Sequence, residues 1–418
     1  MQTKKSMSRG RLSGAVAVAM ALLFTPALAA ADVVLDWNVT MLTTLSGLSP
    51  FATQRFAAIT QLAVFEAVNA VTGEYEPYLG TIEAPAGASA DAAAAAAAHA
   101  VLKFYFPAKG AALDAALAAS LGGISDGQGK TDGITTGLAA AAAMIALRAN
   151  DGSAVPTFYT PVPGPGQWQL TPSCPPAGGT NFHWGNVTPF GVPDVRDFRV
   201  GPPPSLTSGE YRKDYLEVQA VGGRDSVRPQ DREDLARFYA AFAPASWANS
   251  AARQAATAQG RSLSENARGL ALLNMALNDA SVAVFDSKYF YNFWRPETAI
   301  HAGDTDGNSK TDPDAAFTPL ITAPCFPSYP SNHGTASAAA SEVLQRLYGP
   351  SGHDITFSNA AVPGVILHYT AFKRIVEDVH DARVYGGIHF RFDQEAGARQ
   401  GERLGHYIYK NRLRVAHP

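Results

Sequence analysis

The chain has 418 residues, with 33 lysine and arginine residues against 36 aspartate and glutamate residues, so its formal net charge is −3 at pH 7. This balance does not favour a nucleic-acid partner, because nucleic-acid-binding domains carry a marked excess of basic residues. The apolar content of 46% is ordinary for a globular protein, and the length is sufficient for one large domain or two.

Residues 1–29 have the pattern of a secretory signal peptide. Four basic residues precede an apolar stretch, and Ala27–Ala29 fits a cleavage site made of small residues. No second apolar run is long enough to span a membrane, so we expect a secreted or periplasmic protein rather than an integral membrane protein. Removal of these residues takes away four positive charges and no acidic ones, which leaves a mildly acidic mature chain.

Residues 30–206 form the first region that we predict, and it begins with helices. Apolar residues recur at three- and four-residue intervals in 52–71, 88–106 and 131–150, and the alanine-rich runs there are strong helix formers. From 151 to 206 the chain is rich in proline and glycine, which excludes long helices. We therefore expect a long ordered connector after the first helices.

Residues 207–418 form the second predicted region, which is again helical. Helical patterns occupy 208–223, 231–244 and 264–296, and the strand signal is weak along the whole chain. We therefore predict an all-α protein with two helical regions and a proline- and glycine-rich connector between them.

The two cysteines, Cys174 and Cys325, are the only ones in the chain. In an exported protein such a pair is equally compatible with a disulfide and with two buried thiols. No spacing of cysteine and histidine resembles a zinc site.

A first candidate motif, KYFYNFWRPETAI, contains Lys288 and Arg295. They are seven residues apart, so on a helix that ends at Pro296 they fall on one face, two turns apart. Two cations on an otherwise apolar and aromatic helix are costly unless an anion faces them. The alternative is a pair of surface cations whose apolar stems lie along the protein.

A second motif, FPSYPSNHGT, precedes an alanine-rich helix. Ser331 can cap that helix, and the first N–H groups, from Asn332 and His333, have no partner within it. Such a helix start binds phosphate-like anions, and His333 is placed to exchange a proton at its edge. The alternative is an ordinary capped helix start with a surface histidine.

A third motif, ARVYGGIHFRFDQEAG, contains Arg383, the pair Gly386–Gly387, His389 and Asp393. The glycines can bring a loop close to a ligand. His389 and Asp393 are four residues apart, on one helical face, where the carboxylate would fix the tautomer of the histidine. The alternative is an exposed pair of little consequence.

The three motifs in this order resemble the signature of the superfamily that unites type 2 phosphatidic acid phosphatases and vanadium-dependent haloperoxidases. The resemblance is closest to bacterial vanadium-dependent haloperoxidase-like proteins and covers roughly residues 205–410. It implies helical bundles of the vanadium haloperoxidase and acid phosphatase type, with residues 207–418 as the catalytic domain.

The resemblance also implies a role for each residue of an oxyanion pocket. The oxygens of the anion would be bound by Lys288, Arg295, Arg383, Ser331 and the backbone N–H of Asn332. His389 would bond to the vanadium of a vanadate cofactor, or attack phosphorus in a phosphatase. His333 would be the acid–base group, Asp393 would orient His389, and Lys288 would also polarise bound peroxide.

Three positions bear on the details of this resemblance. Asn332 stands where the family pattern has glycine, so its side chain adds bulk beside the anion, and Ala382 stands where a serine usually precedes the last arginine. Phe326 matches a pocket aromatic position of the chloroperoxidases, which indicates an apolar halide side. Core packing is the alternative role for Phe326.

The length, the N-terminal helical half and the sequence around the motifs favour a vanadate-dependent haloperoxidase that uses hydrogen peroxide and halide. The first alternative is a secreted acid phosphatase that hydrolyses a soluble phosphomonoester through a phosphohistidine, with no vanadate. The second is a periplasmic oxyanion-binding protein without turnover. The sequence leaves open the halide, the organic substrate and whether the chain forms a homo-oligomer.

Overall fold

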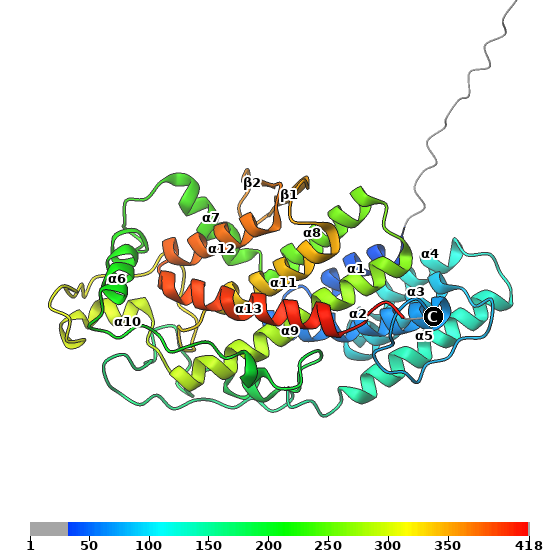
Figure 1. Cartoon of the computed structure of the whole chain (residues 1–418), viewed down its shortest axis with the longest axis horizontal. Coiled ribbons are helices and arrows are strands. Elements are labelled where there is room, and N and C mark those ends of the chain that lie inside the picture. The colour runs from blue at the N-terminus through cyan, green and yellow to red at the C-terminus, as the bar shows by residue number, and fades with distance from the viewer. Residues whose placement is uncertain (1–31, 417–418) are drawn as a thin grey trace, which may run out of the picture. The chain divides into compact units, whose positions relative to one another are not determined.

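The computed structural model describes residues 32–416, which lie in one compact unit that begins at Asp32 (Figure 1). This part of the chain contains thirteen α-helices and one two-stranded sheet, so the predicted all-α class is confirmed. The signal-peptide prediction falls on residues that lie outside the described part. Among residues 32–416, no helix combines the length and the hydropathy that a membrane crossing requires.

The first five helices precede the connector. They are α1 (Val33–Thr44), α2 (Pro50–Thr72), α3 (Ala90–Tyr105), α4 (Gly110–Gly122) and α5 (Gln128–Leu147), with the short 3-10 helix η1 (Pro107–Lys109) between α3 and α4. The helix α3 consists largely of alanine and packs against α5 at very short range. A Cβ atom at Gly137 of α5 would lie 2.3 Å from the carbonyl oxygen of Ala93, so glycine is required for this contact.

The remaining helices follow the connector. They are α6 (Gly209–Val221), α7 (Gln230–Ala241), α8 (Pro244–Gln259), α9 (Leu263–Tyr291), α10 (Pro296–His301), α11 (Asn332–Tyr348), α12 (Phe372–Tyr385) and α13 (Arg391–Asn411). The 3-10 helix η4 (Gly303–Thr305) follows α10. Strands β1 (Ile355–Ser358) and β2 (Ile366–Tyr369) pair antiparallel, with Ile355 opposite Tyr369.

Helix α9 lies at the centre of the described fold and packs against α2, α11 and α13. It begins with a capping box between Ser262 and Glu265, and every residue from Gly269 to Phe285 is buried. One hydrophobic core extends from Val33 to Leu413 and includes α2 and α3 as well as α11 and α13. The division at residue 206 stays a prediction, although the core is shared by helices from both sides of it.

Helices α11 and α13 lie side by side along their length (Figure 1). The contact is made by Gly397, Gly401 and Gly405, which recur every four residues on one face of α13. Cβ atoms at these positions would lie 2.6, 2.1 and 2.6 Å from backbone carbonyl oxygens of α11. Because the two backbones touch, the start of α11 is held beside the start of α13.

The connector is ordered by contacts with α9 and with the segment that follows α9. It contains the 3-10 helices η2 (Phe182–Asn186) and η3 (Val195–Phe198). The buried carboxylate of Asp279 on α9 accepts hydrogen bonds from three successive backbone N–H groups, those of residues 190–192. A disulfide joins Cys174 of the connector to Cys325, whose Cα atoms are 5.3 Å apart, which decides between the two states that the sequence left open.

Candidate oxyanion site

Three cationic side chains from three different elements meet in the protein interior. Lys288 lies in the last turn of α9, Arg295 precedes the first turn of α10, and Arg383 lies in the last turn of α12. Lys288 and Arg295 are fully buried, and Arg383 is 4% exposed. Burial of three like charges is costly, so their meeting needs a compensating interaction.

The expectation that Lys288 and Arg295 share one helix face is wrong. Helix α9 ends at Tyr291, because Asn292 adopts a left-handed conformation with φ of 49°. The chain then pairs with the connector through a bridge between Gln167 and Phe293, and this pairing carries Arg295 back toward Lys288. Pro296 therefore begins α10 instead of ending α9.

Other protein groups form hydrogen bonds with only some of the nitrogens of these three cations. The ammonium group of Lys288 donates to the carbonyl oxygens of Pro327 and Ser328 at 2.8 and 2.7 Å. Arg295 donates from Nε to the carbonyl of Phe326 and from Nη1 to that of Ile388, both at 2.9 Å. Three buried nitrogens, Nη2 of Arg295 and Nε and Nη1 of Arg383, have no hydrogen-bond partner among residues 32–416. These N–H groups are those that a buried anion would satisfy.

Burial lowers the pKa of each of the three cations, and repulsion between the charges adds to this effect at Lys288 and Arg295. Burial lowers the pKa of Lys288 well below its usual value, and the neighbouring charges of Arg295 and Arg383 lower it further. Burial lowers the pKa of Arg295 to about 9 and that of Arg383 to about 10. An anion bound among these groups would reverse the shifts, because an opposite charge favours the protonated form.

His389 lies immediately beside the cations and is held by a carboxylate. Its Nδ1 is 2.8 Å from Oδ2 of Asp393, and its Nε2 is 3.1 Å from Nη1 of Arg295. Since the arginine can only donate, Nε2 accepts and the proton lies on Nδ1, which donates to Asp393. Burial, together with Arg295, Lys288 and Arg383, lowers the pKa of His389 well below its usual value, so the ring is neutral.

The expectation that His389 and Asp393 lie on one face of a helix is wrong, although their side chains do contact each other. Helix α13 begins at Arg391, so His389 precedes it and Asp393 lies in its first turn. Asp393 folds back toward the helix start, where Oδ2 also accepts from the backbone N–H of Phe390 at 3.2 Å. The glycines before His389 serve a backbone contact, since a Cβ at Gly387 would lie 2.2 Å from the carbonyl oxygen of Gly222.

Ser328 is a site residue that the sequence motifs did not single out. Its Oγ donates to Oδ2 of Asp393 at 2.5 Å and lies 3.3 Å from Nδ1 of His389. Burial raises the pKa of Asp393 to about 7, while the hydrogen bond from Ser328 opposes that rise. The signal for Ser328 was its place in FPSYPSNHGT, but only the fold brings it to Asp393.

The start of α11 forms another wall of the site. Ser331 caps the helix, and its Oγ accepts from the backbone N–H of Gly334 at 3.2 Å, as expected. His333 is partly exposed, and burial together with Arg383, Lys288 and Arg295 lowers the pKa of His333 well below its usual value. The side chain of Asn332 is directed to α9, where its Oδ1 lies 3.4 Å from Oγ of Ser281.

Phe326 forms an apolar wall under the cations. Its ring centroid lies 5.3 Å from the Lys288 ammonium and 5.0 Å from the Arg295 guanidinium carbon. The ring also packs edge-on against Phe285 of α9 and Phe51 of α2. Phe51, which no sequence motif singled out, brings the N-terminal half of the chain into contact with the site wall. Core packing and contact with the cations therefore coexist at Phe326.

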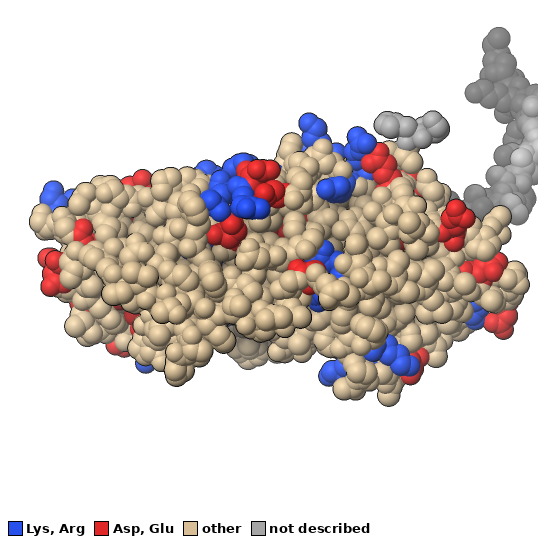
Figure 2. Space-filling model, turned by 90° about the horizontal axis from the view of Figure 1, so that it is seen from below, with Lys and Arg blue, Asp and Glu red and all other residues tan. Residues whose placement is uncertain are grey.

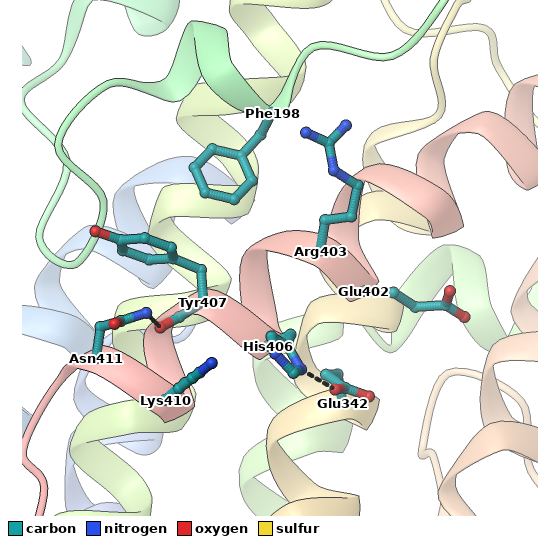
Figure 3. A pocket seen from close by; sticks show the side chains of 8 residues that line it. All are labelled: Phe198, Glu342, Glu402, Arg403, His406, Tyr407, Lys410 and Asn411. Carbon is teal, nitrogen blue, oxygen red and sulfur yellow. Dashed lines mark hydrogen bonds and ion pairs between the residues drawn. The ribbon is translucent and has the colours of Figure 1, made fainter.

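The surface differs from this interior. The face in Figure 2 carries acidic and basic side chains next to one another. A groove of about 590 Å³ on α11 and α13 is lined by residues such as Phe198, His406 and Tyr407 (Figure 3), and it includes none of the oxyanion residues. No group of three or more His, Cys, Asp or Glu side chains within residues 32–416 is arranged to hold a metal ion.

Comparisons with known proteins agree with the helical fold. Residues 268–417 match a family model described as the VCPO second helical-bundle domain. A bacterial vanadium-dependent iodoperoxidase structure superimposes with a TM-score of 0.76 at 24% sequence identity, covering 92% of this chain and 97% of that one. The apo form of a bacterial vanadium-dependent chloroperoxidase gives a TM-score of 0.71 at 18% identity, covering 88% and 94%.

A search of curated proteins gave no match. The family model and the solved structures confirm the resemblance to the vanadium haloperoxidase-like superfamily that the three motifs indicated. The chain has the helical fold of these proteins.

Proposed function

We propose that this chain, which has the helical fold of the vanadium-dependent haloperoxidases, is a vanadate-dependent haloperoxidase-like enzyme that oxidises halide with hydrogen peroxide. Lys288, Arg295 and Arg383 would bind the vanadate oxygens, with the capped start of α11 at Ser331. The Nε2 atom of His389 would bond to vanadium. When bound, vanadate supplies a Lewis-acid centre that activates peroxide toward halide.

The observation that carries the proposal is the set of three buried guanidinium nitrogens that find no hydrogen-bond partner in the described part of the chain. A protein that only needed these arginines for packing would pair them with carboxylates or carbonyls. Here the unpaired donors accompany a neutral His389 whose Nε2 accepts a hydrogen bond from Arg295. The donor set therefore fits a tetrahedral oxyanion that also bonds to a nitrogen.

The residues of the chain would have separate roles around this anion. Asp393 holds the proton of His389 at Nδ1, which keeps Nε2 free of a proton. His333, partly exposed at the start of α11, would accept a proton from the incoming peroxide at the accessible edge. Lys288 would polarise the bound oxygens, and Phe326 would give the halide an apolar contact that excludes water.

The same geometry supports a second candidate, a phosphomonoesterase. A neutral histidine held by a carboxylate is an arrangement that suits nucleophilic attack, here of Nε2 on phosphorus. His333 would then protonate the leaving oxygen and later activate water. Preorganised cations stabilise the trigonal bipyramidal phosphoryl transition state in the way that they would bind vanadate.

A paired assay on the mature protein tests these proposals. One arm contains orthovanadate, peroxide and bromide and follows halogenation of a phenol, and the other follows phosphate release from an aryl phosphate without vanadate. We expect vanadate-dependent halogenation that His389→Ala abolishes and His368→Ala, a change of an exposed histidine on β2, leaves intact.

Each other outcome of this assay has a definite meaning. Phosphate release that vanadate inhibits, without halogenation, would replace the haloperoxidase proposal by the phosphatase. Oxyanion binding without either reaction would indicate a binding protein. Full activity in His389→Ala would reject the site itself.

We also propose that the protein is secreted or periplasmic. The proposal is supported by the pattern of residues 1–29 and by the disulfide between Cys174 and Cys325, since such bonds persist in oxidising compartments.

A further inference from the structure

Arginine and tyrosine side chains line a second cavity, close to the far end of α11. Its volume is about 280 Å³. Arg346 of this cavity lies 13 residues after His333 on the same helix, which at about 1.5 Å per residue is roughly 20 Å. The polar side chains of its wall are those of Tyr75, Arg261, Arg268, Arg346, Tyr348 and Tyr409, together with the carboxylate of Glu265.

Each arginine of the cavity makes a cation–π contact with a tyrosine ring. The guanidinium carbon of Arg268 lies 5.1 Å from the ring centroid of Tyr75 and 5.4 Å from that of Tyr409. Arg346 lies 5.7 Å from the Tyr409 ring. Arg261 lies 5.9 Å from the Tyr348 ring. Such cation–π contacts attract the guanidinium groups to the rings, and the guanidinium N–H groups remain hydrogen-bond donors.

Carboxylates neutralise two of the three arginines. Arg261 pairs with Glu265 at 2.7 Å, and Arg346 pairs with Glu342 at 2.7 Å. Figure 3 shows Glu342 facing His406, and the Nδ1 atom of His406 is 2.7 Å from Nη2 of Arg346. Glu342 and His406, which also line the groove on α11 and α13, therefore fix the position of Arg346.

Arg268 differs from the other two arginines. Its Nε donates to the backbone carbonyl of Leu413 at 2.6 Å. Within residues 32–416 it forms no ion pair with a carboxylate, and its two terminal nitrogens donate no hydrogen bond. The terminal nitrogens form the fork that binds a carboxylate or phosphate through two parallel hydrogen bonds.

Tyr348, another residue of the cavity wall, carries a hydroxyl group. The side chain of Tyr348 is 7% exposed, and its hydroxyl lies over the glycine that follows Arg268 in α9, since a Cβ at Gly269 would lie 3.2 Å from it. That hydroxyl forms no hydrogen bond with another described residue. Arg268 and Tyr348 thus both line one polar cavity.

We propose that this cavity is an anion-binding site, separate from the oxyanion cluster, that takes a small molecule through a phosphate or carboxylate group. Arg268 binds the anion with both terminal nitrogens, Tyr348 donates from its hydroxyl, and Arg261 and Arg346 contribute positive potential. The volume leaves room for an organic portion, which would lie against the rings of Tyr75 and Tyr409.

The stoichiometry of inorganic phosphate binding tests the proposal. Equilibrium dialysis of the mature protein with labelled phosphate is expected to give two equivalents, one at each site. Arg268→Ala should lose one equivalent, whereas Arg196→Ala, which removes an exposed arginine elsewhere, should lose none. Tyr348→Phe, which keeps the ring, should raise the Kd of the phosphate bound in this cavity about fivefold, as expected for the loss of one neutral hydrogen bond.

The variants separate this site from the oxyanion cluster. Arg383→Ala should remove only the other equivalent, and the equivalent that survives in Arg268→Ala shows that this variant is folded. Unchanged stoichiometry in Arg268→Ala would overturn the proposal, and so would the absence of any equivalent that depends on Arg268. The unaltered protein could instead bind a single equivalent that depends on Arg268 and not on Arg383. In that case the oxyanion assignment fails and the second site stands.

Discussion

At Asp393, one carboxylate oxygen receives hydrogen bonds from three donors. Nδ1 of His389, Oγ of Ser328 and the backbone N–H of Phe390 all approach Oδ2, while Oδ1 has no partner among the described residues. The charge of Asp393 is therefore concentrated where it fixes the histidine tautomer. Since burial raises the pKa of Asp393 to about 7, the tautomer is held at neutral and higher pH and released in acid.

This arrangement predicts a pH effect for Ser328→Ala. The hydroxyl stabilises the ionised carboxylate, so its loss should raise the pKa of Asp393 further. Hydrogen bonds to charged groups contribute about 1.5–3 kcal/mol, and one pH unit corresponds to about 1.4 kcal/mol, so the acidic limb of kcat/KM should move up by at least about one unit.

The control for this experiment is Ser341→Ala, which changes a buried serine of α11 that contacts Gln345 and not Asp393. Its pH profile of kcat/KM should match that of the unaltered protein. An unchanged profile in Ser328→Ala would show that Asp393 is not the group that titrates.

Asn332 supports a second prediction at the scale of a residue. Its side chain is directed to Ser281 of α9, whose Oγ also contacts Oε1 of Gln54 on α2. Asn332→Gly keeps the backbone N–H and removes this tether.

We expect the Kd for orthovanadate in Asn332→Gly to stay within about threefold, or roughly 0.7 kcal/mol, or to become tighter. Equilibrium dialysis would measure it. A loss of more than about tenfold would mean that the amide itself binds the anion.

At the scale of elements, ion pairs join three helices around the start of α13. Arg391 donates to Glu217 of α6 and to Asp381 of α12, both at 2.6 Å, and Asp381 also accepts from Arg232 of α7 at 3.0 Å. Asp381 precedes Arg383 by two residues, and Arg391 follows His389 by two. The pairs therefore connect the two elements that carry Arg383 and His389.

Arg391→Gln should loosen this connection. The pairs are roughly a quarter exposed, so we expect a loss of about 1–3 kcal/mol in the free energy of unfolding, more than a surface pair would give. Arg374→Gln, which breaks an exposed pair with Glu377 on α12, should cost less than about 1 kcal/mol. Denaturant midpoints compare the two, and equal losses would mean that the Arg391 pairs are as weak as surface pairs.

At the scale of the whole molecule, both halves of the chain share one core. Helix α9 is buried from Gly269 to Phe285 because α2 covers one side and α11 and α13 cover others. Phe51 of α2 reaches the site through Phe326. If the chain were divided at residue 206, the surfaces that α2 and α9 bury against each other would be exposed to water.

We therefore expect a fragment of residues 207–418 to be unable to fold alone as a monomer, because the α2 face of α9 would be open to water. Circular dichroism and size-exclusion chromatography of the fragment would measure this. A folded, monomeric fragment would instead support the two regions predicted from the sequence. The full mature chain is the reference, and it should elute as a discrete species.

The sequence by itself determined the helical class and most helix positions, and it singled out Lys288, Arg295, Arg383, His389 and Asp393, which the fold brings together. Helical periodicity, alanine content and capping residues act locally, so they are readable without the fold. The motif around Ser331 predicted a capped helix, and the structure has that helix from Asn332.

Only the tertiary structure decided how the cluster is built. Lys288 and Arg295 meet because Asn292 ends α9 and the connector pairs with Phe293, and neither event follows from periodicity. Ser328, Phe51 and the bond between Cys174 and Cys325 likewise depend on contacts between distant segments. Local preferences are encoded residue by residue, whereas long-range packing selects which distant groups become neighbours, and that selection exists only in the folded chain.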